Sequence, residues 1–285
     1  MKEINLKARA KLNISLDVTE KRSDGYHNML MVMQTVSLHD KVRITTDESG
    51  ELKAFSNLRF IPGDQRNLAV KAAARYLREI EREDVGAKIN IEKRIPVGAG
   101  MGGGSADAAA VLRGMNMLFE GALSEERLLE ISADVGSDVP FCLMGGTALA
   151  EGRGEILSPL PAMPDCLFVI CKPDFSISTP ELFKKLDSSG RRRHPDTAGM
   201  IEALGRGDLI QICRRMYNVF EDVDDRRMRT VQEIKGSLLD FGALGAMMTG
   251  TGSAVFGVFN DKDAAEKCCE RLRGGYSFCC VAKPE

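Results

Sequence analysis

The feature that most limits the fold of this 285-residue chain is a run of glycines at 98–104, where five of seven residues are Gly. Ile89, Ile91 and Ile95 alternate with polar residues ahead of it, which predicts a strand, and small residues at about 106–119 predict a helix after it. Glycine lets the backbone approach a ligand closely and take positive φ. The first turn of a helix offers free N–H groups and a positive dipole end. The segment therefore predicts a phosphate-binding loop, because a plain strand-to-helix turn needs only one or two glycines.

Two common phosphate loops fit this segment poorly. A Walker A loop needs a Lys between its last Gly and its hydroxyl residue, and here Gly104 is followed directly by Ser105. The spacing of Gly98, Gly100 and Gly103 does match the dinucleotide fingerprint. That fingerprint also requires a second parallel strand with an acidic residue about 20 positions later, and here the next segment, 124–135, is again helical. A nicotinamide-dependent dehydrogenase is therefore disfavoured.

The composition narrows the class of protein and its partners. Lys and Arg number 39 against 41 Asp and Glu, and 44% of residues are hydrophobic, which favours a globular protein over a disordered one. The near-neutral charge and the absence of Trp argue against nucleic acid or anionic membrane as partners. The eight cysteines include no C-x-x-C pair, and no apolar leader is evident, so we expect reduced thiols, no zinc site and a cytoplasmic protein.

The N-terminal segment predicts a strand and a return strand. Residues 11–18 alternate polar and apolar, so Lys11 and Asn13 project from one polar face. An Asp-Gly turn follows, and Tyr26 and His27 open a Met- and Val-rich return strand. We therefore expect Tyr26 and His27 near the polar strand.

The remaining elements follow from caps and periodicity. The Thr179-Pro180 pair predicts an N-cap and first helical residue, and three prolines near 160 mark a domain boundary that divides the chain into 1–160 and 161–285. The basic segment 191–194 is interpreted as a solvated loop, with phosphate binding as the alternative. The predicted helices follow Asn67 and Ser124 and cover about 179–186, 208–220, 224–240 and 262–273; strands are predicted on either side of a turn within 241–259 and at 276–282.

Two further segments are candidates for chemistry. Asp138 lies between a helix end and an expected strand, next to Gly136, where its carboxylate can accept a proton from a hydroxyl group. Taken alone it is equally a turn or cap residue. The segment 249–253 reads Thr-Gly-Thr-Gly-Ser and, taken alone, is a hairpin turn.

Together with the opening Ala-Lys-Leu-Asn at 10–13, these segments resemble the GHMP kinase superfamily. The resemblance implies a two-domain α+β fold, with a glycine-rich phosphate loop in the N-terminal domain and a ferredoxin-like C-terminal domain. It also implies ATP as phosphoryl donor with Mg²⁺. The segments 22–27, 102–109 and 136–141 are most similar to the branch that phosphorylates the 2-hydroxyl of a cytidine-diphospho-methylerythritol, a small-molecule substrate.

The resemblance also implies a role for each matching residue. Lys11 and Asp138 would form the catalytic pair, with Asp138 as general base. The substrate would be bound by Asn13, Tyr26, His27, Thr179 and Phe183, with Tyr26 and Phe183 stacking on cytosine and His27 hydrogen-bonding to it. Ser105 would hold magnesium. ATP would be bound by Pro96, Val97, Gly98, Ala99, Gly100, Met101, Gly102, Gly103, Gly104 and Ser105, and the C-terminal glycine motif would comprise Gly250, Thr251, Gly252 and Ser253.

Several alternatives stay open from the sequence. A sister kinase acting on homoserine or mevalonate is disfavoured by Asp-Gly-Tyr-His at 24–27, and a non-catalytic nucleotide-binding module is disfavoured by the joint presence of Lys11 and Asp138. Phe183 is alternatively a core residue of a short helix, and His39 is interpreted as a loop residue. Asp107 is not assigned as a second magnesium ligand. We expect no obligate protein partner.

Overall fold

The computed structural model describes residues 2–189 and 193–285, and these divide into two compact units. Unit 1 comprises Met1–Ala10, Leu38–Ile95 and Gly102–Gly145, and unit 2 comprises Lys11–Ser37, Pro96–Met101 and Gly146–Glu285. The predicted domains, 1–160 and 161–285, are contiguous in sequence, whereas these units are not. That domain division stays a prediction.

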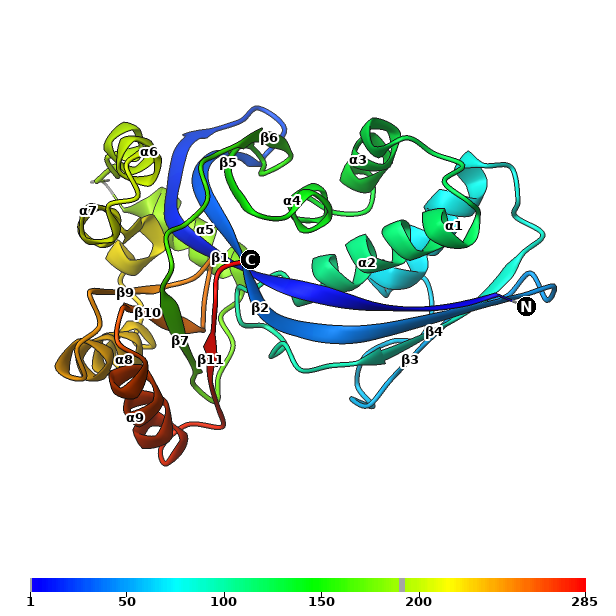
Figure 1. Cartoon of the computed structure of the whole chain (residues 1–285). Coiled ribbons are helices and arrows are strands. Elements are labelled where there is room, and N and C mark those ends of the chain that lie inside the picture. The colour runs from blue at the N-terminus through cyan, green and yellow to red at the C-terminus, as the bar shows by residue number, and fades with distance from the viewer. Residues whose placement is uncertain (1, 190–192) are drawn as a thin grey trace. The chain divides into compact units, whose positions relative to one another are not determined.

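Unit 1 is a sheet with helices on one face. Its strand β4 pairs antiparallel with the C-terminal part of β2 and parallel with β3. Alternate residues such as Val42, Ile44, Ile89 and Ile91 are buried, and α1 and α2 cover this apolar face (Figure 1). The elements that contribute to unit 1 are β1 (Glu3–Lys21) and β2 (His27–Asp47), each in part, and β3 (Leu52–Ser56), α1 (Leu68–Glu79), β4 (Gly86–Glu92), α2 (Gly103–Leu118), α3 (Glu125–Ala133) and α4 (Val139–Met144).

Local chemistry explains where these helices begin and how closely they pack. Asn67 accepts a hydrogen bond from Ala69 N at the start of α1, and Ser124 caps α3 in the same way. Helix α2 approaches the sheet closely at Gly114, where a Cβ would lie 2.6 Å from a methyl group of Ile44. The predicted helices after Asn67 and Ser124 are therefore confirmed.

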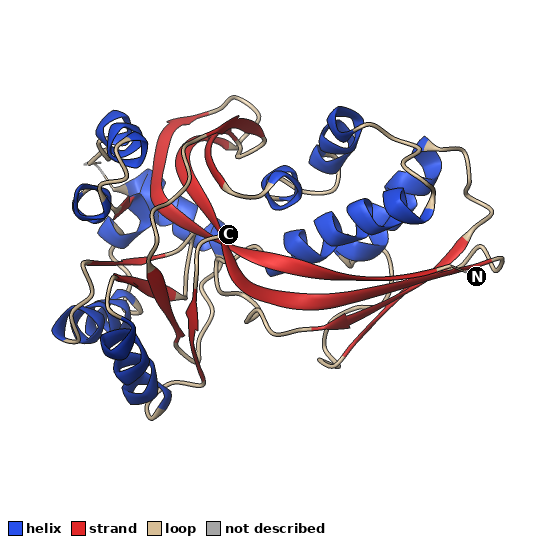
Figure 2. Ribbon diagram, viewed as in Figure 1, coloured by secondary structure: helices blue, strands red, loops and turns tan. Residues whose placement is uncertain are grey.

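Unit 2 contains a four-stranded antiparallel sheet with the order β11-β7-β10-β9. Its helices α8 and α9 pack against this sheet (Figure 2). Separately, β5 and β6 extend the N-terminal part of β2, and β8 pairs parallel with β1 at Ser15 and Leu16. The other elements of unit 2 are β5 (Thr147–Gly152), β6 (Ile156–Pro159), β7 (Leu167–Lys172), α5 (Thr179–Ser188), α6 (Thr197–Gly205), α7 (Leu209–Arg214), β8 (Tyr217–Asn218), the 3₁₀ turn Val219–Asp222, α8 (Met228–Asp240), β9 (Gly245–Met248), β10 (Val255–Phe259), α9 (Lys262–Arg273) and β11 (Phe278–Ala282).

The structure confirms some element predictions and corrects others. The strand pair within 241–259, the helix 262–273 and the last strand are confirmed. The helix expected over 208–220 is present but too long, because α7 ends at Arg214 and Asn218 bonds to other backbone groups instead of continuing a helix. The strand expected after Asp138 is also wrong, since the short helix α4 begins there. Helix α6 was not predicted, and the N-cap of α5 is Ser178 rather than Thr179.

Two features concern membrane-spanning segments and the cysteines. Within the described part of the chain, no helix combines the length and apolar character needed to cross a bilayer. All eight cysteines lie in this part and are free thiols. Burial raises the pKa of Cys166 and of Cys213 to about 12, so these thiols stay protonated at neutral pH. Residues 191 and 192 of the predicted basic loop lie outside the described residues.

Candidate active site

The glycine segment has the backbone of a tight loop that ends in a helix. Gly98, Gly100 and Gly102 have φ of 66°, 75° and 67°, a region that side chains with a Cβ rarely adopt. Gly102 is the N-cap of α2, whose first helical hydrogen bond runs from Ala106 N to Gly102 O at 2.8 Å. The helix therefore starts earlier than the predicted Ala106, and Ser105 lies in its first turn. That turn leaves its backbone N–H groups for a ligand.

The loop is attached to strand β1 and to the C-terminal glycine motif. Lys11 donates its backbone N–H to Met101 O at 3.1 Å, and Ala254 N donates to Ala99 O at 3.2 Å. At Gly100 a Cβ would collide with the carbonyl oxygen of Thr249. Glycine at position 100 is thus required by this close approach, apart from any role in ligand binding.

Residues from both sides of the loop form a buried ion cluster that sequence analysis missed. Asp40 Oδ1 accepts backbone hydrogen bonds from Arg94 and Ile95, at 2.5 and 2.8 Å. Lys93 Nζ bonds Asp40 and also Asp107 Oδ2, the latter at 2.7 Å. Burial raises the pKa of Asp107 to about 7. The cluster ties the strand before the loop to the first turns of α2, where Asp107 accepts a hydrogen bond from Lys93.

The polar face of β1 is confirmed, but it is buried rather than exposed to solvent. Lys11 is 5% exposed and Asn13 is fully buried. Lys11 Nζ donates to Asn13 Oδ1 at 2.7 Å, which orients both side chains. Burying an ammonium group is costly, and the hydrogen bond to Asn13 offsets part of that cost.

Asp138 occupies the N-cap position of α4 and is half-buried. Its side chain makes no capping hydrogen bond, which weighs against the alternative that it is a simple cap residue. Asp138 belongs to unit 1 and Lys11 to unit 2.

The C-terminal glycine motif is held by residues that sequence analysis did not single out. Asn218 Nδ2 donates to the carbonyl oxygens of Met248 and Gly250, at 2.7 and 2.8 Å. Within the motif, Ser253 Oγ donates to Phe175 O at 2.5 Å. A lone Asn far from the motif in sequence carries no pattern that could have revealed this role.

Thr179 and Thr251 are brought together, with their hydroxyl oxygens 2.9 Å apart. Thr179 was predicted at the substrate and Thr251 in the glycine motif. The start of α5 and the glycine motif are therefore neighbours within unit 2.

The aromatic residues predicted to bind a base form two groups. His27 and Phe183 stack, with ring centroids 4.7 Å apart and an interplanar angle of 24°. Phe183 also meets the edge of Phe220 at 4.9 Å. Tyr26 is 57% exposed, and the guanidinium of Arg153 lies 5.2 Å from its ring centroid. Phe183 is thus a partner of His27, and Tyr26 presents its ring to solvent.

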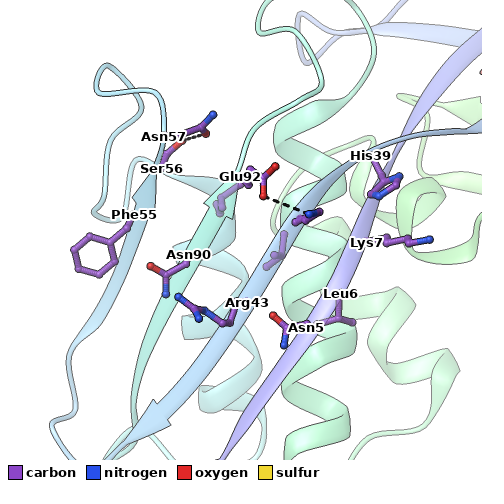
Figure 3. A pocket seen from close by; sticks show the side chains of 13 residues that line it. Asn5, Leu6, Lys7, His39, Arg43, Phe55, Ser56, Asn57, Asn90 and Glu92 are labelled. Atoms are coloured by element: carbon purple, nitrogen blue, oxygen red, sulfur yellow. Dashed lines mark hydrogen bonds and ion pairs between the residues drawn. The ribbon is translucent and has the colours of Figure 1, made fainter. Parts of the chain in front are cut away.

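A hollow of about 670 Å³ lies on unit 1, against the face of the sheet opposite α1 and α2 (Figure 3). Its lining includes Lys7, His39, Arg43, Phe55 and Asn90. None of the residues predicted for the site lines it. His39 is therefore a strand residue at this surface, not the loop residue that was expected.

Comparisons with known proteins find similar sequences along most of the chain. Residues 67–146 match the model of the GHMP kinases N terminal domain, and residues 200–277 match that of the GHMP kinases C terminal domain. The chain is 45% identical over 275 residues to the 4-diphosphocytidyl-2-C-methyl-D-erythritol kinase of Syntrophomonas wolfei, covering 96% of each chain. It is 41% identical to the kinase of the same name from Clostridium tetani, covering 98% of this chain and 99% of that one.

The chain is also similar to solved structures along nearly its whole length. A crystal structure of 4-(cytidine 5'-diphospho)-2C-methyl-D-erythritol kinase superposes with a TM-score of 0.81 at 31% identity, over 99% of both chains. A homoserine kinase from Cytophaga hutchinsonii superposes with a TM-score of 0.78 at 21% identity, over 100% of this chain and 95% of that one. The second likeness shows a shared fold.

Proposed function

This chain belongs to the 4-diphosphocytidyl-2-C-methyl-D-erythritol kinases of the GHMP family, and on that premise we propose how its residues carry out the transfer. The chain is an ATP-dependent small-molecule kinase. Its reaction moves the γ-phosphoryl group of ATP to the 2-hydroxyl of 4-(cytidine 5'-diphospho)-2-C-methyl-D-erythritol, in the non-mevalonate route to isoprenoid precursors. The bond from the γ-phosphorus to the bridging oxygen of ADP breaks, and a bond to the substrate oxygen forms.

The glycine loop, 96–105, binds the phosphates of ATP. The left-handed glycines bring backbone N–H groups toward an anion, and the first turn of α2 adds its own N–H groups and dipole. Gly104 is exposed, and a Cβ there would have its nearest neighbour at 3.6 Å, so space exists for a ligand.

Ser105 holds magnesium in this proposal. Mg²⁺ prefers oxygen ligands and is often bound through one or two protein groups plus substrate phosphates. Among the described residues, no group of three or more His, Cys, Asp or Glu is placed to hold a metal ion. When bound, the ion would supply neutralisation of phosphate charge.

Asp138 and Lys11 act on the acceptor and on the transferring group. Asp138 accepts the proton of the 2-hydroxyl as the oxygen bonds to phosphorus. The Lys11 ammonium, held by Asn13, stabilises the charge that develops on the phosphoryl oxygens. Phosphoryl transfer depends mainly on positioning and charge stabilisation, so we assign the larger share of catalysis to Lys11 and the loop.

The cytosine ring binds at Tyr26, His27 and Phe183. Tyr26 stacks on the base, and His27, oriented by Phe183, hydrogen-bonds to its edge. Asn13 and Thr179 contact the rest of the substrate. We also propose a cytoplasmic location without nucleic-acid, membrane or obligate protein partners.

The observation that best supports this function is the hydrogen bond from Lys11 N to Met101 O at 3.1 Å. It attaches the proposed catalytic lysine directly to the phosphate loop. The test is a panel of acceptors with ATP: the cytidyl methylerythritol substrate, homoserine and mevalonate. We expect turnover with the cytidyl compound. Turnover only with homoserine or mevalonate would reject the assignment, and turnover with none would favour a binding module.

A further inference from the structure

His27 is held by two residues of the same helix, α5. Phe183 stacks on the face of the imidazole, and Asp187, one turn later, lies at its edge. Asp187 Oδ1 is 2.8 Å from His27 Nε2, and the two side chains are only 22% and 8% exposed. Residues four apart share a helix face, so α5 presents both partners to the ring at once.

The carboxylate determines which nitrogen of His27 carries the proton. Lys21 Nζ donates to Asp187 Oδ2 at 2.7 Å. The hydrogen bond from Lys21, followed by that from His27, lowers the pKa of Asp187, so the carboxylate is ionised at neutral pH. An ionised carboxylate only accepts hydrogen bonds, so Nε2 must carry the proton. In the neutral imidazole, Nδ1 is then an acceptor.

We infer that Asp187 is a positioning residue that makes the site select cytosine over uracil, by fixing Nδ1 of His27 as an acceptor for the exocyclic amino group. Cytosine carries an amino donor at its 4-position, whereas uracil carries a carbonyl acceptor there. An acceptor facing a carbonyl leaves both groups unpaired, and sites built this way reject the wrong ligand strongly. The inference rests on the proposed function, because it takes this ring pair as the nucleobase site.

The first test reads the tautomer of His27 directly, without any activity. The chain has three histidines, so ¹⁵N NMR of the full chain labelled at histidine is assigned with His39→Gln and His194→Gln variants. At a pH where the ring is neutral, we expect the proton on Nε2. A proton on Nδ1 in the unmutated chain would overturn the inference.

The second test uses Asp187→Asn, whose amide can face His27 in two ways. Lys21 can only donate a hydrogen bond, whereas His27 can donate or accept one, so the amide oxygen stays with Lys21 and the NH₂ group turns to Nε2. Nε2 must then accept, and the proton moves to Nδ1. We expect the ratio of CDP to UDP affinity, measured by calorimetry, to fall by about 10- to 100-fold, the loss typical of a buried unpaired group.

Lys21→Met is the matched control. It removes the charge beside Asp187 but leaves the carboxylate as acceptor for Nε2, so the CDP to UDP ratio should stay close to that of the unmutated chain. ATP affinity should be the same in all three proteins. A ratio unchanged in Asp187→Asn would overturn the inference, because a merely structural Asp187 would weaken both nucleotides alike. If that variant does not fold, the tautomer of His27 measured by NMR in the unmutated chain still tests the inference.

Failure of the inference and failure of the proposed function give different results. Phosphoryl transfer to the cytidyl substrate, with a CDP to UDP ratio independent of Asp187, rejects the inference alone. A ratio that depends on Asp187, without phosphoryl transfer to that substrate, supports the inference and rejects the proposed function.

Discussion

Asn13 donates its backbone N–H to Oγ1 of Thr249 at 3.0 Å, a hydrogen bond between residues 236 positions apart in sequence. Both residues are fully buried. Thr249 Oγ1 also lies 3.5 Å from Gly100 O, at the limit of a hydrogen bond. Thr249 directly precedes the C-terminal glycine motif. Its hydroxyl group thus contacts both the strand that carries Lys11 and the glycine loop.

We therefore predict that Thr249→Val destabilises the protein by about 1–3 kcal/mol, because it leaves the buried N–H of Asn13 without an acceptor. Thr249→Ser keeps the hydroxyl and is the control. The free energy of unfolding in urea measures the difference. Equal stability of the Val and Ser variants would show that this hydrogen bond contributes little.

Asp138→Asn should lower kcat by about 10²–10⁴-fold with little change in the binding of either substrate, since it removes a general base at constant shape. Lys11→Met should cost at least as much. If the two residues act as a unit, the double variant should be little worse than the worse single one. Single-turnover kinetics measures the chemical step.

The control for the Asp138→Asn variant is Asp134→Asn, which alters an exposed Asp of unit 1 that pairs with Arg75. It should turn over normally. Near-normal kcat in Asp138→Asn would reduce Asp138 to a structural role.

Gly104→Ala should fold normally and yet bind ATP poorly. The new Cβ would meet protein only at 3.6 Å, but it would occupy the space assigned to phosphate. A misplacement of about 1 Å can cost on the order of 100-fold in rate, so we expect kcat/KM for ATP to fall about tenfold or more. Gly205→Ala, where nothing lies within 4 Å of the Cβ, is the control. Unchanged kcat/KM for ATP would argue that the phosphates bind elsewhere.

Tyr26→Ala should weaken the binding of the cytidyl substrate more than the binding of ATP. Stacking on a base is worth roughly 1–3 kcal/mol, or about 5- to 150-fold in affinity. Phe60→Ala, another exposed aromatic at 70%, is the control and should change neither. Equal losses for both substrates would mean that Tyr26 is structural.

The stability of the Asp107→Asn variant, measured relative to that of the unmutated chain, should increase as the pH rises. The folded-state pKa of about 7 lies above the unfolded value of 3.8, so folding favours the protonated carboxyl. That contribution is fully present below about pH 4 and is lost as the pH rises toward 7. The Tm of the Asn variant minus the Tm of the unmutated chain should therefore increase between about pH 4 and pH 7. The increase should be roughly 2–4 °C for each kcal/mol of stability that the unmutated chain loses. A difference independent of pH would show that Asp107 is ionised throughout, paired with Lys93.

The sequence was informative where local chemistry decides the structure. The caps at Asn67 and Ser124, the glycines before α2 and the alternation along residues 11–18 each depend on near neighbours in the chain. The same alternation could not tell a buried polar face from a solvated one. Burial of Lys11 and Asn13 depends on segments distant in sequence.

The errors have the same physical origin. A helix was expected over 208–220, but Asn218 instead bonds to Met248 and Gly250, about thirty positions later. Asp187 was missed for a similar reason, because its partners Lys21 and His27 lie in the first strand pair. Contacts of this kind leave no periodic trace in one sequence.

The two compact units are each assembled from several stretches of chain, with crossings at 10/11, 37/38, 95/96, 101/102 and 145/146. No single cut of the gene releases either unit as one uninterrupted fragment. Neither unit can therefore be expressed separately, exchanged as a cassette or completed on the ribosome before the other has begun. Tolerance to truncation should accordingly be poor at both ends, since losing the first ten residues removes a strand segment from unit 1 and losing the last strand removes an edge of the sheet in unit 2.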